Sequence, residues 1–249
     1  MSFRNLKAVI PVREGSERVK EKVLLPFANV TLYEWKILQL LQVLPPEQIV
    51  VSTNSERLID IALKYNLSIH KREDKYCIGN EIPFSEVIHH VISGIDAEHI
   101  AWTTCVVPLM SPKEYKDGFI QYYKALKDGH DSLVAFNLLK DYLWNDEGSL
   151  NYSASEGHVV SQKLPNVYRV TNGLYMAPKE IMLKRKYFVG CNPYKFIVSK
   201  IAGIDIDYLE DYKMSLSLIN MYYEEHMNEV HDNLVKRHSI NKEAETSNI

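Results

Sequence analysis

The chain has 249 residues, 46% of them hydrophobic and 24% charged, which is enough to bury the core of one α/β domain, alone or with a small appendage. Its formal net charge of -3 argues against a protein that coats nucleic acid, although a local basic pocket for phosphates is compatible with an acidic average. The three cysteines lie far apart and show no CxxC spacing, so neither a disulfide framework nor a zinc site is indicated. The apolar run before Arg13 is too short for a signal peptide or a membrane span, and we expect a cytoplasmic protein with no membrane or nucleic-acid partner.

Short apolar runs alternate with segments of helical periodicity, which is the pattern of a largely parallel sheet covered by helices. The expected strands are 7–11, 48–52, 100–104, 132–136 and 173–176, and the expected helices are 31–44, 56–65, 85–95, 112–127 and 209–225. In the segment 85–95, Val87, Val91 and Ile95 fall on one face, and Ser85 can cap the start. The sequence therefore predicts an α/β fold.

Residues 137–169 interrupt this alternation with turn chemistry at 145–148 and 156–157, and we expect a hairpin-bearing arm there. Such an arm often serves dimerisation. Apolar periodicity is lost after about Asn228, so we expect one domain over 1–228 and a flexible tail over 229–249.

The first expected strand runs directly into a basic loop, PVREGSERVKEK, in which Arg13, Arg18 and Lys22 lie within ten residues. Gly15 allows close approach of the backbone to an anion, Ser16 can donate a hydrogen bond, and guanidinium groups can grip phosphate oxygens with paired bonds. The loop suits a triphosphate. Neither GxxxxGK[ST] nor GxGxxG is present, which argues against kinases and dehydrogenases. The alternative is a solvated charged loop without a ligand.

A second group of polar residues is the segment GIDIDYLED, which contains Asp205 and Asp207. Residues two apart in an extended segment project from the same face, so both carboxylates can reach one hard cation, for which Mg²⁺ is the natural candidate. Alternatively, one aspartate caps the helix that begins near Tyr208. Asp211 is as compatible with stabilising the start of that helix as with catalysis.

A third group lies in SQKLPNVYRVTNGLYMAP, where Gln162, Tyr168, Asn172 and Tyr175 supply neutral hydrogen-bonding groups and Arg169 supplies a cation. These groups could hold a hydroxyl-rich, anionic sugar. The two tyrosines are equally compatible with ordinary positions in a β-sheet.

Together, these blocks resemble the acylneuraminate cytidylyltransferase family, which comprises the CMP-sialic acid synthetases and relatives that activate legionaminic, pseudaminic and 3-deoxy-octulosonic acids. The resemblance spans roughly residues 7–220. It begins with KAVIPVREGSERVKEK, which is similar to IPAR-x-GS-x-x-x-x-x-K, and continues with IVVSTNSERLIDIALKY, which is similar to the VSTDSE segment. QKLPNVYRVTNGLYMA then resembles Q-x-x-P-x-x-Y-x-x-NGAxYI, and GIDIDYLEDYKMS resembles DID-x-x-x-DW.

The resemblance implies a Rossmann-like nucleotidyltransferase fold, dependence on Mg²⁺, and a homodimer in which each subunit's protruding arm reaches the partner's site. It implies that CTP and an acidic sugar are the substrates, that the anomeric hydroxyl attacks the α-phosphate with loss of pyrophosphate, and that the product serves surface glycan biosynthesis. The family's phosphate loop matches this chain at Arg13, Ser16 and Lys22, and the chemistry of the loop adds Gly15 and Arg18. The family's metal ligands match Asp205 and Asp207. The residues on the sugar side match Gln162, Tyr168 and Asn172. We expect Arg13, Lys22 and Asp207 to be catalytic through positioning and charge neutralisation.

Several positions depart from the family pattern. Glu17 stands where the family usually has lysine, Val23 stands where it has asparagine, and TTCVVPLM at 103–110 replaces LQPTSPLR. Loss of a glutamine and an arginine beside the site leaves the acceptor open among a nonulosonic acid, a 3-deoxy sugar acid, and a phosphonate or sugar phosphate. A catalytically silent nucleotide-binding descendant is the alternative of a different class.

Overall fold

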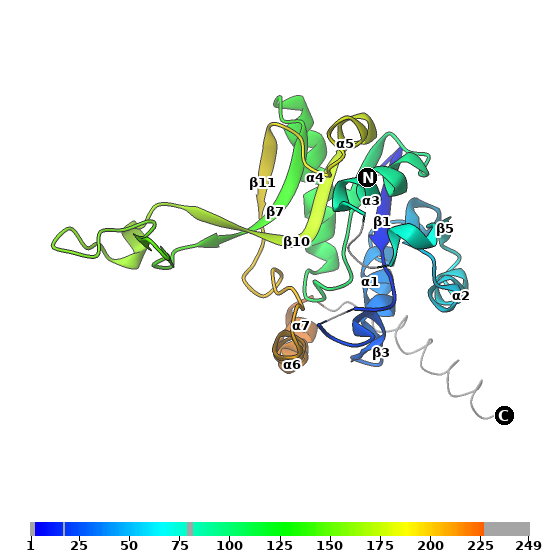
Figure 1. The fold of residues 1–249 in the computed structure, drawn as a ribbon, viewed down its shortest axis with the longest axis horizontal. Helices are drawn as coiled ribbons and strands as arrows, with labels where there is room; N and C mark the ends of the chain where they lie inside the picture. The colour runs from blue at the N-terminus through cyan, green and yellow to red at the C-terminus, as the bar shows by residue number, and fades with distance from the viewer. Residues whose placement is uncertain (1–2, 17, 79–81, 227–249) are drawn as a thin grey trace.

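The central element is a seven-stranded sheet with the strand order β11-β7-β10-β6-β1-β4-β5 (Figure 1). The computed structural model describes residues 3–16, 18–78 and 82–226. Glu17 and the tail expected over 229–249 lie outside the described residues. β10 pairs antiparallel with both of its neighbours, whereas the other adjacent strands pair parallel. This arrangement confirms the predicted α/β fold with a mostly parallel sheet.

Seven helices accompany the sheet within the described ranges. The strands of the sheet are β1 (Leu6–Pro11), β4 (Ile49–Thr53), β5 (Ser68–Lys71), β6 (His99–Trp102), β7 (Ser132–Leu139), β10 (Val167–Pro178) and β11 (Pro193–Ile197). The helices are α1 (Leu32–Leu41), α2 (Glu56–Lys64), α3 (Phe84–Ser93), α4 (Pro112–Lys127), α5 (Lys179–Arg185), α6 (Leu209–Ser217) and α7 (Ile219–His226). Two short ribbons pair β2 (Pro26–Phe27) with β3 (Val30–Thr31) and β8 (Trp144–Asn145) with β9 (Gly148–Ser149). None of the helices in this part of the chain is both long and apolar enough to cross a membrane.

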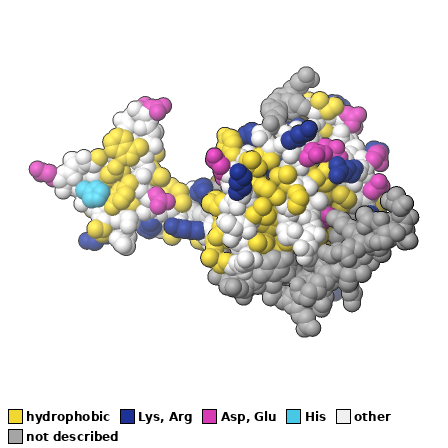
Figure 2. Space-filling view, turned by 90° about the horizontal axis from the view of Figure 1, so that it is seen from below, with side chains coloured by type: hydrophobic (Ala, Val, Ile, Leu, Met, Phe, Trp, Pro, Cys, Tyr) yellow, Lys and Arg dark blue, Asp and Glu magenta, His cyan; other side chains and the backbone are white. Residues whose placement is uncertain are grey.

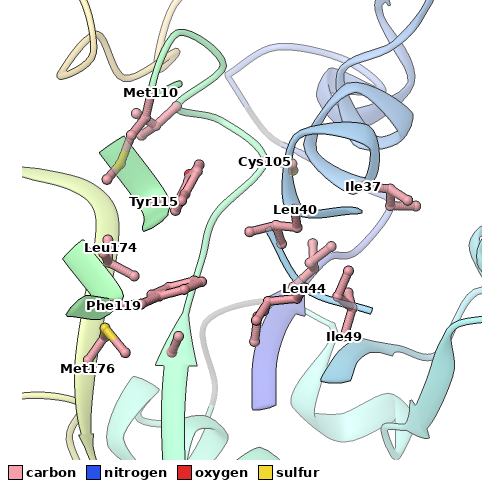
Figure 3. Close-up of a cluster of buried hydrophobic side chains, with 14 of the residues drawn as sticks. Ile37, Leu40, Leu44, Ile49, Cys105, Met110, Tyr115, Phe119, Leu174 and Met176 are labelled. Atoms are coloured by element: carbon pink, nitrogen blue, oxygen red, sulfur yellow. The ribbon is translucent and has the colours of Figure 1, made fainter. Parts of the chain in front are cut away.

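The apolar runs of the strands are explained by helices on both faces of the sheet. Ile10 of β1 belongs to the core formed with α1, α2 and α4, whereas its neighbour Val9 belongs to the core formed with α3 and α5. Successive side chains of a strand point to opposite faces, so an unbroken apolar run needs cover on both sides. Figure 3 shows the first core, where Phe119 of α4 lies close to Leu174 and Met176 of β10.

The elements that the sequence does not reveal lack a long apolar run. β5 is half exposed at one edge of the sheet, and β11 begins with Pro193 at the other edge, where strands accept proline.

The expected cap at Ser85 is wrong, because α3 begins at Phe84 after Pro83 and has no side-chain cap. The single helix expected over 209–225 is two helices, α6 and α7, which are separated at Leu218.

An arm leaves the sheet between β7 and β10, at the place where the sequence predicts one (Figure 1). The two strands remain paired at its base, with Leu139 opposite Val167. The β8–β9 hairpin lies within the arm, and Asn145 Oδ1 accepts hydrogen bonds from the backbone N–H groups of Glu147 and Gly148, each at 3.0 Å. An Asx turn of this kind fixes a tight reversal. The role of the arm in dimerisation stays a prediction.

Lys36 and Gln39 of α1 are fully buried polar side chains that face the loop after β6. Lys36 Nζ donates to Val107 O at 3.0 Å and also to the hydroxyl of Tyr115, while Gln39 Nε2 donates to Pro108 O at 2.7 Å. Burial lowers the pKa of Lys36 to about 7. The carbonyls of an irregular buried segment need donors, and α1 supplies them. The loop of residues 103–110 is thereby fixed beside the carboxyl end of β6.

We predict that Lys36→Met changes the pH dependence of stability. In the unfolded chain the lysine regains its ordinary pKa of 10.5, so above pH 7 the unfolded state binds more protons than the native state. Stability contributed by this group therefore rises with pH. Between pH 7 and 9, the unfolding free energy of the unsubstituted protein should rise relative to that of Lys36→Met by about 2 kcal/mol, measured by urea titration.

The matched control is Lys116→Met, which removes an exposed lysine from α4. It should leave the pH profile of the unfolding free energy unchanged. Parallel profiles for Lys36→Met and the unsubstituted protein would contradict the effect of burial on Lys36.

Candidate functional site

A cavity of about 410 Å³ opens at the carboxyl ends of β1 and β6, the edge of an open α/β sheet at which ligands bind. Pro11 and Trp102, the last residues of these strands, line it. Four cationic side chains also line it: Arg13, Arg18, Lys22 and Arg72. The cavity therefore has a positive wall that suits an anion.

The basic loop after β1 is brought to this cavity as the sequence indicated. Arg13, Ser16, Arg18 and Lys22 line the cavity, and Arg13 Nη1 is held by the backbone carbonyl of Cys77 at 2.8 Å. Gly15 has a φ of +81° and open space around the position of a Cβ, so its backbone adopts a conformation that other residues rarely take. These contacts assemble the proposed phosphate loop, whereas the role of each residue stays a prediction.

The segment before α6 closes over the basic loop. Asp207 Oδ1 lies 2.8 Å from Arg18 Nη2 and 3.7 Å from Lys22 Nζ. Lys22 Nζ also donates to Ile206 O, and the Arg18 guanidinium lies 5.3 Å from the ring centroid of Tyr208. The segment near residue 207 thus lies against the basic loop. Arg18 and Lys22 of that loop line the cavity, whereas Asp205 and Asp207 are not among its lining residues.

Asp205 and Asp207 flank a residue that points into the core. Ile206 is fully buried, and its N–H donates to Val106 O at 2.9 Å, whereas both aspartates are partly exposed. Burial raises the pKa of Asp205, the hydrogen bond from Asn172 lowers it, and the nearby charge of Asp207 raises it. The binding of one cation by both carboxylates stays a prediction.

The helix α6 is capped by Asp211 and not by Asp205 or Asp207, for which capping was the alternative role. Oδ2 of Asp211 accepts the backbone N–H groups of Asp207 at 3.0 Å and Tyr208 at 2.7 Å, at the start of α6. Its carboxylate also lies near the positive end of that helix. The side chains of Asp205 and Asp207 are consequently not needed as caps.

Asp205 has an oxygen suited to a cation. Its Oδ2 accepts from Asn172 Nδ2 at 2.7 Å, whereas its buried Oδ1 has no hydrogen-bond partner among the described residues. Within residues 3–16, 18–78 and 82–226, no group of three or more His, Cys, Asp or Glu side chains could hold a metal ion. Two carboxylate ligands fit Mg²⁺, which keeps waters and takes substrate phosphates as further ligands.

The expected sugar-binding residues are not all brought together within one chain. Asn172 lies beside Asp205, as the hydrogen bond between them shows. Gln162 is exposed on a short 3-10 helix in the arm, and Tyr168 lies at the base of the arm opposite Leu138 of β7. Neither lines the cavity, because Gln162 lies in the arm that projects from the sheet (Figure 1) and Tyr168 lies in β10 where this strand enters the arm.

Arg72 is the cavity residue that the sequence pattern missed. It follows β5, is only 6% exposed, and donates from Nη2 to Val12 O and to Ser52 O at 2.9 Å. Its Nε has no hydrogen-bond partner and its guanidinium forms no ion pair with the residues that the structure describes. Burial lowers the pKa of Arg72. The one feature of the sequence that could have indicated Arg72 is its position directly after β5, an edge strand without a long apolar run.

Part of the cavity lining is apolar. Phe84 and Val87 of α3, Trp102 of β6 and Val106 of the following loop line it. Trp102 and Phe84 both contact the ring of Phe188, at centroid distances of 5.6 Å and 6.2 Å. A cavity with both basic and apolar lining suits a ligand that combines phosphates with less polar groups.

Comparison with known proteins gives distant relatives along most of the chain. The chain is 20% identical to pseudaminic acid cytidylyltransferase of Campylobacter jejuni over 230 residues, which cover 89% of this chain and 99% of the relative. It is 23% identical to N-acylneuraminate cytidylyltransferase of Escherichia coli, over 85% of this chain and 51% of the relative. The fold is similar to that of CMP:2-keto-3-deoxy-manno-octonic acid synthetase complexed with CTP, with a TM-score of 0.60, 12% identity, and coverage of 87% of this chain and 98% of that chain.

A family model described as cytidylyltransferase matches residues 7–135, which is more than half of the chain. The matched part contains β1, the basic loop and β6, the elements that build most of the cavity. The chain therefore belongs to the cytidylyltransferase family and is a nucleotidyltransferase enzyme.

Proposed function

We propose that this enzyme transfers CMP from CTP to an acidic sugar, a nonulosonic or 3-deoxy-ulosonic acid, releasing pyrophosphate, for surface glycan biosynthesis. The observation that carries the proposal is the convergence of four cations on one cavity, with Asp207 paired to two of them, Arg18 and Lys22. The names of the relatives, which refer to pseudaminic and N-acylneuraminic acids, support the acceptor class. The neighbour complexed with CTP supports the nucleotide.

The triphosphate of CTP would bind against the basic wall. Arg13 and Lys22 are partly buried at the base of the loop, so their charges act with less screening by water than exposed cations would. Arg18 pairs with Asp207 and can exchange that partner for a phosphate oxygen. These groups orient the α-phosphate and offset charge on the departing pyrophosphate.

The cation that completes the site would be Mg²⁺, held by Asp205 and Asp207. Bound Mg²⁺ neutralises phosphate charge and favours departure of pyrophosphate. The protein's own contribution is to keep the two carboxylates close to Lys22, whose Nζ lies 3.7 Å from Asp207 Oδ1. Lys22 is tied to Ile206 O, so the position of the carboxylates is coupled to the phosphate loop.

In the proposed reaction, an oxygen of the acceptor's anomeric hydroxyl attacks the α-phosphorus, and the bond from this phosphorus to the bridging oxygen breaks. The bonding electrons leave with pyrophosphate, and the hydroxyl loses its proton. Catalysis of this kind depends on alignment and charge neutralisation more than on a covalent intermediate.

The segment 103–110 favours a second class of acceptor. Thr104 donates to Asn172 O at 2.7 Å, Cys105 is buried, and Val106 lines the cavity, so this wall offers few free polar groups to a sugar. A phosphonate without a sugar ring would need fewer hydroxyl contacts there, and a sugar phosphate is the other acceptor that the sequence leaves open. The alternative is therefore a cytidylyltransferase that acts on one of those compounds.

We also propose a homodimer in which the arm of one subunit reaches the site of the other. The arm carries exposed apolar side chains, among which Trp144 is 61% exposed, and Figure 2 shows hydrophobic side chains along it. Tyr142 and Tyr152 pack at 4.7 Å between ring centroids and give the arm a small aromatic cluster of its own. Apolar surface of this kind marks an interaction site. The dimer would bring Gln162 and Tyr168 to a cavity that they do not reach within their own chain.

Lys22→Ala should raise the KM for CTP or lower kcat by at least tenfold, since a tenfold loss corresponds to about 1.4 kcal/mol, the magnitude of one charged contact to phosphate. Initial rates of pyrophosphate release at varied CTP measure this effect. Lys20→Ala removes an exposed lysine from the same loop and should leave the rates unchanged. Equal rates for the two variants would place the phosphates elsewhere.

Asp207→Asn should abolish pyrophosphate release at saturating CTP and Mg²⁺, because it removes a ligand charge while keeping the size of the side chain. The control is Glu210→Gln, an exposed carboxylate in the first turn of α6. Both variants should retain the thermal unfolding midpoint. A folded Asp207→Asn protein with near-normal turnover would refute the role of Asp207.

The proposed reaction is tested by pyrophosphate release from each of the four nucleoside triphosphates with Mg²⁺, across nonulosonic acids, 3-deoxy sugar acids, sugar phosphates and aminoalkylphosphonates. Release with CTP and a sugar acid is the expected result. Release only with a phosphonate or sugar phosphate would support the second class of acceptor. Binding of CTP without release from any pair would indicate a catalytically silent homologue.

A further inference from the structure

Asn172 occupies an unusual backbone conformation next to the cavity. Its φ is 57°, in the left-handed region, and the register of β10 against β7 shifts between Val170 and Tyr175. Asparagine tolerates this region better than most residues, and irregularities in a strand often redirect a side chain beside a functional site. The bulge turns the side chain of Asn172 toward Asp205, on a segment 33 residues away.

Three hydrogen bonds fix Asn172. Thr104 Oγ1 donates to its carbonyl oxygen at 2.7 Å, the hydroxyl of Tyr175 donates to its Oδ1, and its Nδ2 donates to Asp205 Oδ2 at 2.7 Å. An ionised carboxylate only accepts hydrogen bonds, so the amide must present its NH₂ group to Asp205 and its oxygen to Tyr175. Asp205 therefore determines the orientation of the amide, and the hydroxyl of Tyr175 donates to the oxygen that this orientation presents.

Tyr175 anchors this arrangement in the core. It is only 4% exposed, and its ring packs against Phe188 at a centroid distance of 4.0 Å. Because the ring is held by packing, its hydroxyl has a fixed position from which to orient Asn172. Thr104 lies in the loop that α1 holds in place through Lys36 and Gln39. Both supports of Asn172 are thus rigid.

We propose that Asn172 is a positioning residue for Asp205, braced by Thr104 and Tyr175, and that the brace keeps one carboxylate oxygen of Asp205 available for a divalent cation. The amide occupies Oδ2, while the buried Oδ1 has no partner among the described residues. Without the amide, the carboxylate of Asp205 is free to rotate toward Lys22, whose positive charge attracts it and lowers its pKa. Groups that orient a metal ligand commonly change metal affinity by about 10- to 100-fold. The inference rests on the proposed function, since it concerns the cation of that site.

The test compares variants that remove one hydroxyl at a time. Tyr175→Phe removes the hydrogen bond to the Asn172 side chain, and Thr104→Val removes the one to its backbone. Thr104→Ser restores the second hydroxyl and should behave as the unsubstituted protein. Tyr187→Phe removes an exposed neighbouring hydroxyl outside the brace and is the matched control for Tyr175→Phe.

Calorimetry would measure the affinity of each variant for Mn²⁺–CTP and, in EDTA, for CTP alone. Tyr175→Phe and Thr104→Val should weaken Mn²⁺–CTP binding by about tenfold and leave the affinity for CTP alone unchanged. In turnover assays they should need about tenfold more Mg²⁺ for half-maximal rate, with rates recovered at high Mg²⁺. A defect of general structure would weaken both affinities and would not be recovered by Mg²⁺.

Affinities for Mn²⁺–CTP equal to that of the unsubstituted protein in both variants would overturn the positioning role while leaving the proposed function intact. Equal loss of both affinities, or activity that Mg²⁺ does not restore, would also overturn it. If Mn²⁺ gives the unsubstituted protein no added affinity for CTP, the proposed cation site fails, and the inference fails with it.

Discussion

The meeting of the basic loop with the aspartate segment is the constraint on which the site depends. Lys22 bonds to Ile206 O, and Asp207 lies between Arg18 and Lys22, so two segments from opposite ends of the chain are held together by opposite charges. Asp207 partly neutralises these two cations, which would otherwise repel one another. A triphosphate bound together with a metal ion can replace these ion pairs, because the phosphates can pair with Arg18 and Lys22 while the metal ion binds the aspartates.

The two apolar cores of the sheet support the basic loop, whereas Ile206 anchors the aspartate segment in a third buried cluster with Trp35 of α1 and Leu109. Helix α1 also supports the irregular loop after β6. Parallel pairing of β1 with β4 and β6 brings the ends of these strands to one edge, beneath the cavity. The loop after β6 has no strand to pair with, so α1 satisfies its carbonyls from Lys36 and Gln39. Burying a lysine is costly, and the lowered pKa of Lys36 reflects that cost. The hydrogen bonds of Lys36 to Val107 O and to the hydroxyl of Tyr115 offset part of this cost. They also order the loop in which Thr104 donates to Asn172 O.

The sequence predicts the parts of this structure that repeat a local rule. The continuous apolar runs of β1 and β4, the periodicity of α4 and the alternation around Ile206 indicate the fold and the paired aspartates. The sequence does not predict the features that arise from contacts between residues far apart in the chain. Arg72 follows an edge strand without an apolar run, and the interaction of Asn172 with Asp205 depends on an irregularity in β10. Gln162 and Tyr168 match a motif by position, yet neither lines the cavity.

The central claim is that the cavity at the ends of β1 and β6 holds the nucleotide, and that Asp205 and Asp207 hold its cation. A crystal structure of the protein soaked with CTP and Mn²⁺, with the metal located by its anomalous scattering, tests this claim most directly. The account predicts phosphate oxygens within hydrogen-bond distance of Arg13 and Lys22, and an anomalous peak next to both Asp205 and Asp207. Nucleotide bound at another edge of the sheet, or a metal away from the two aspartates in the presence of bound CTP, would contradict it.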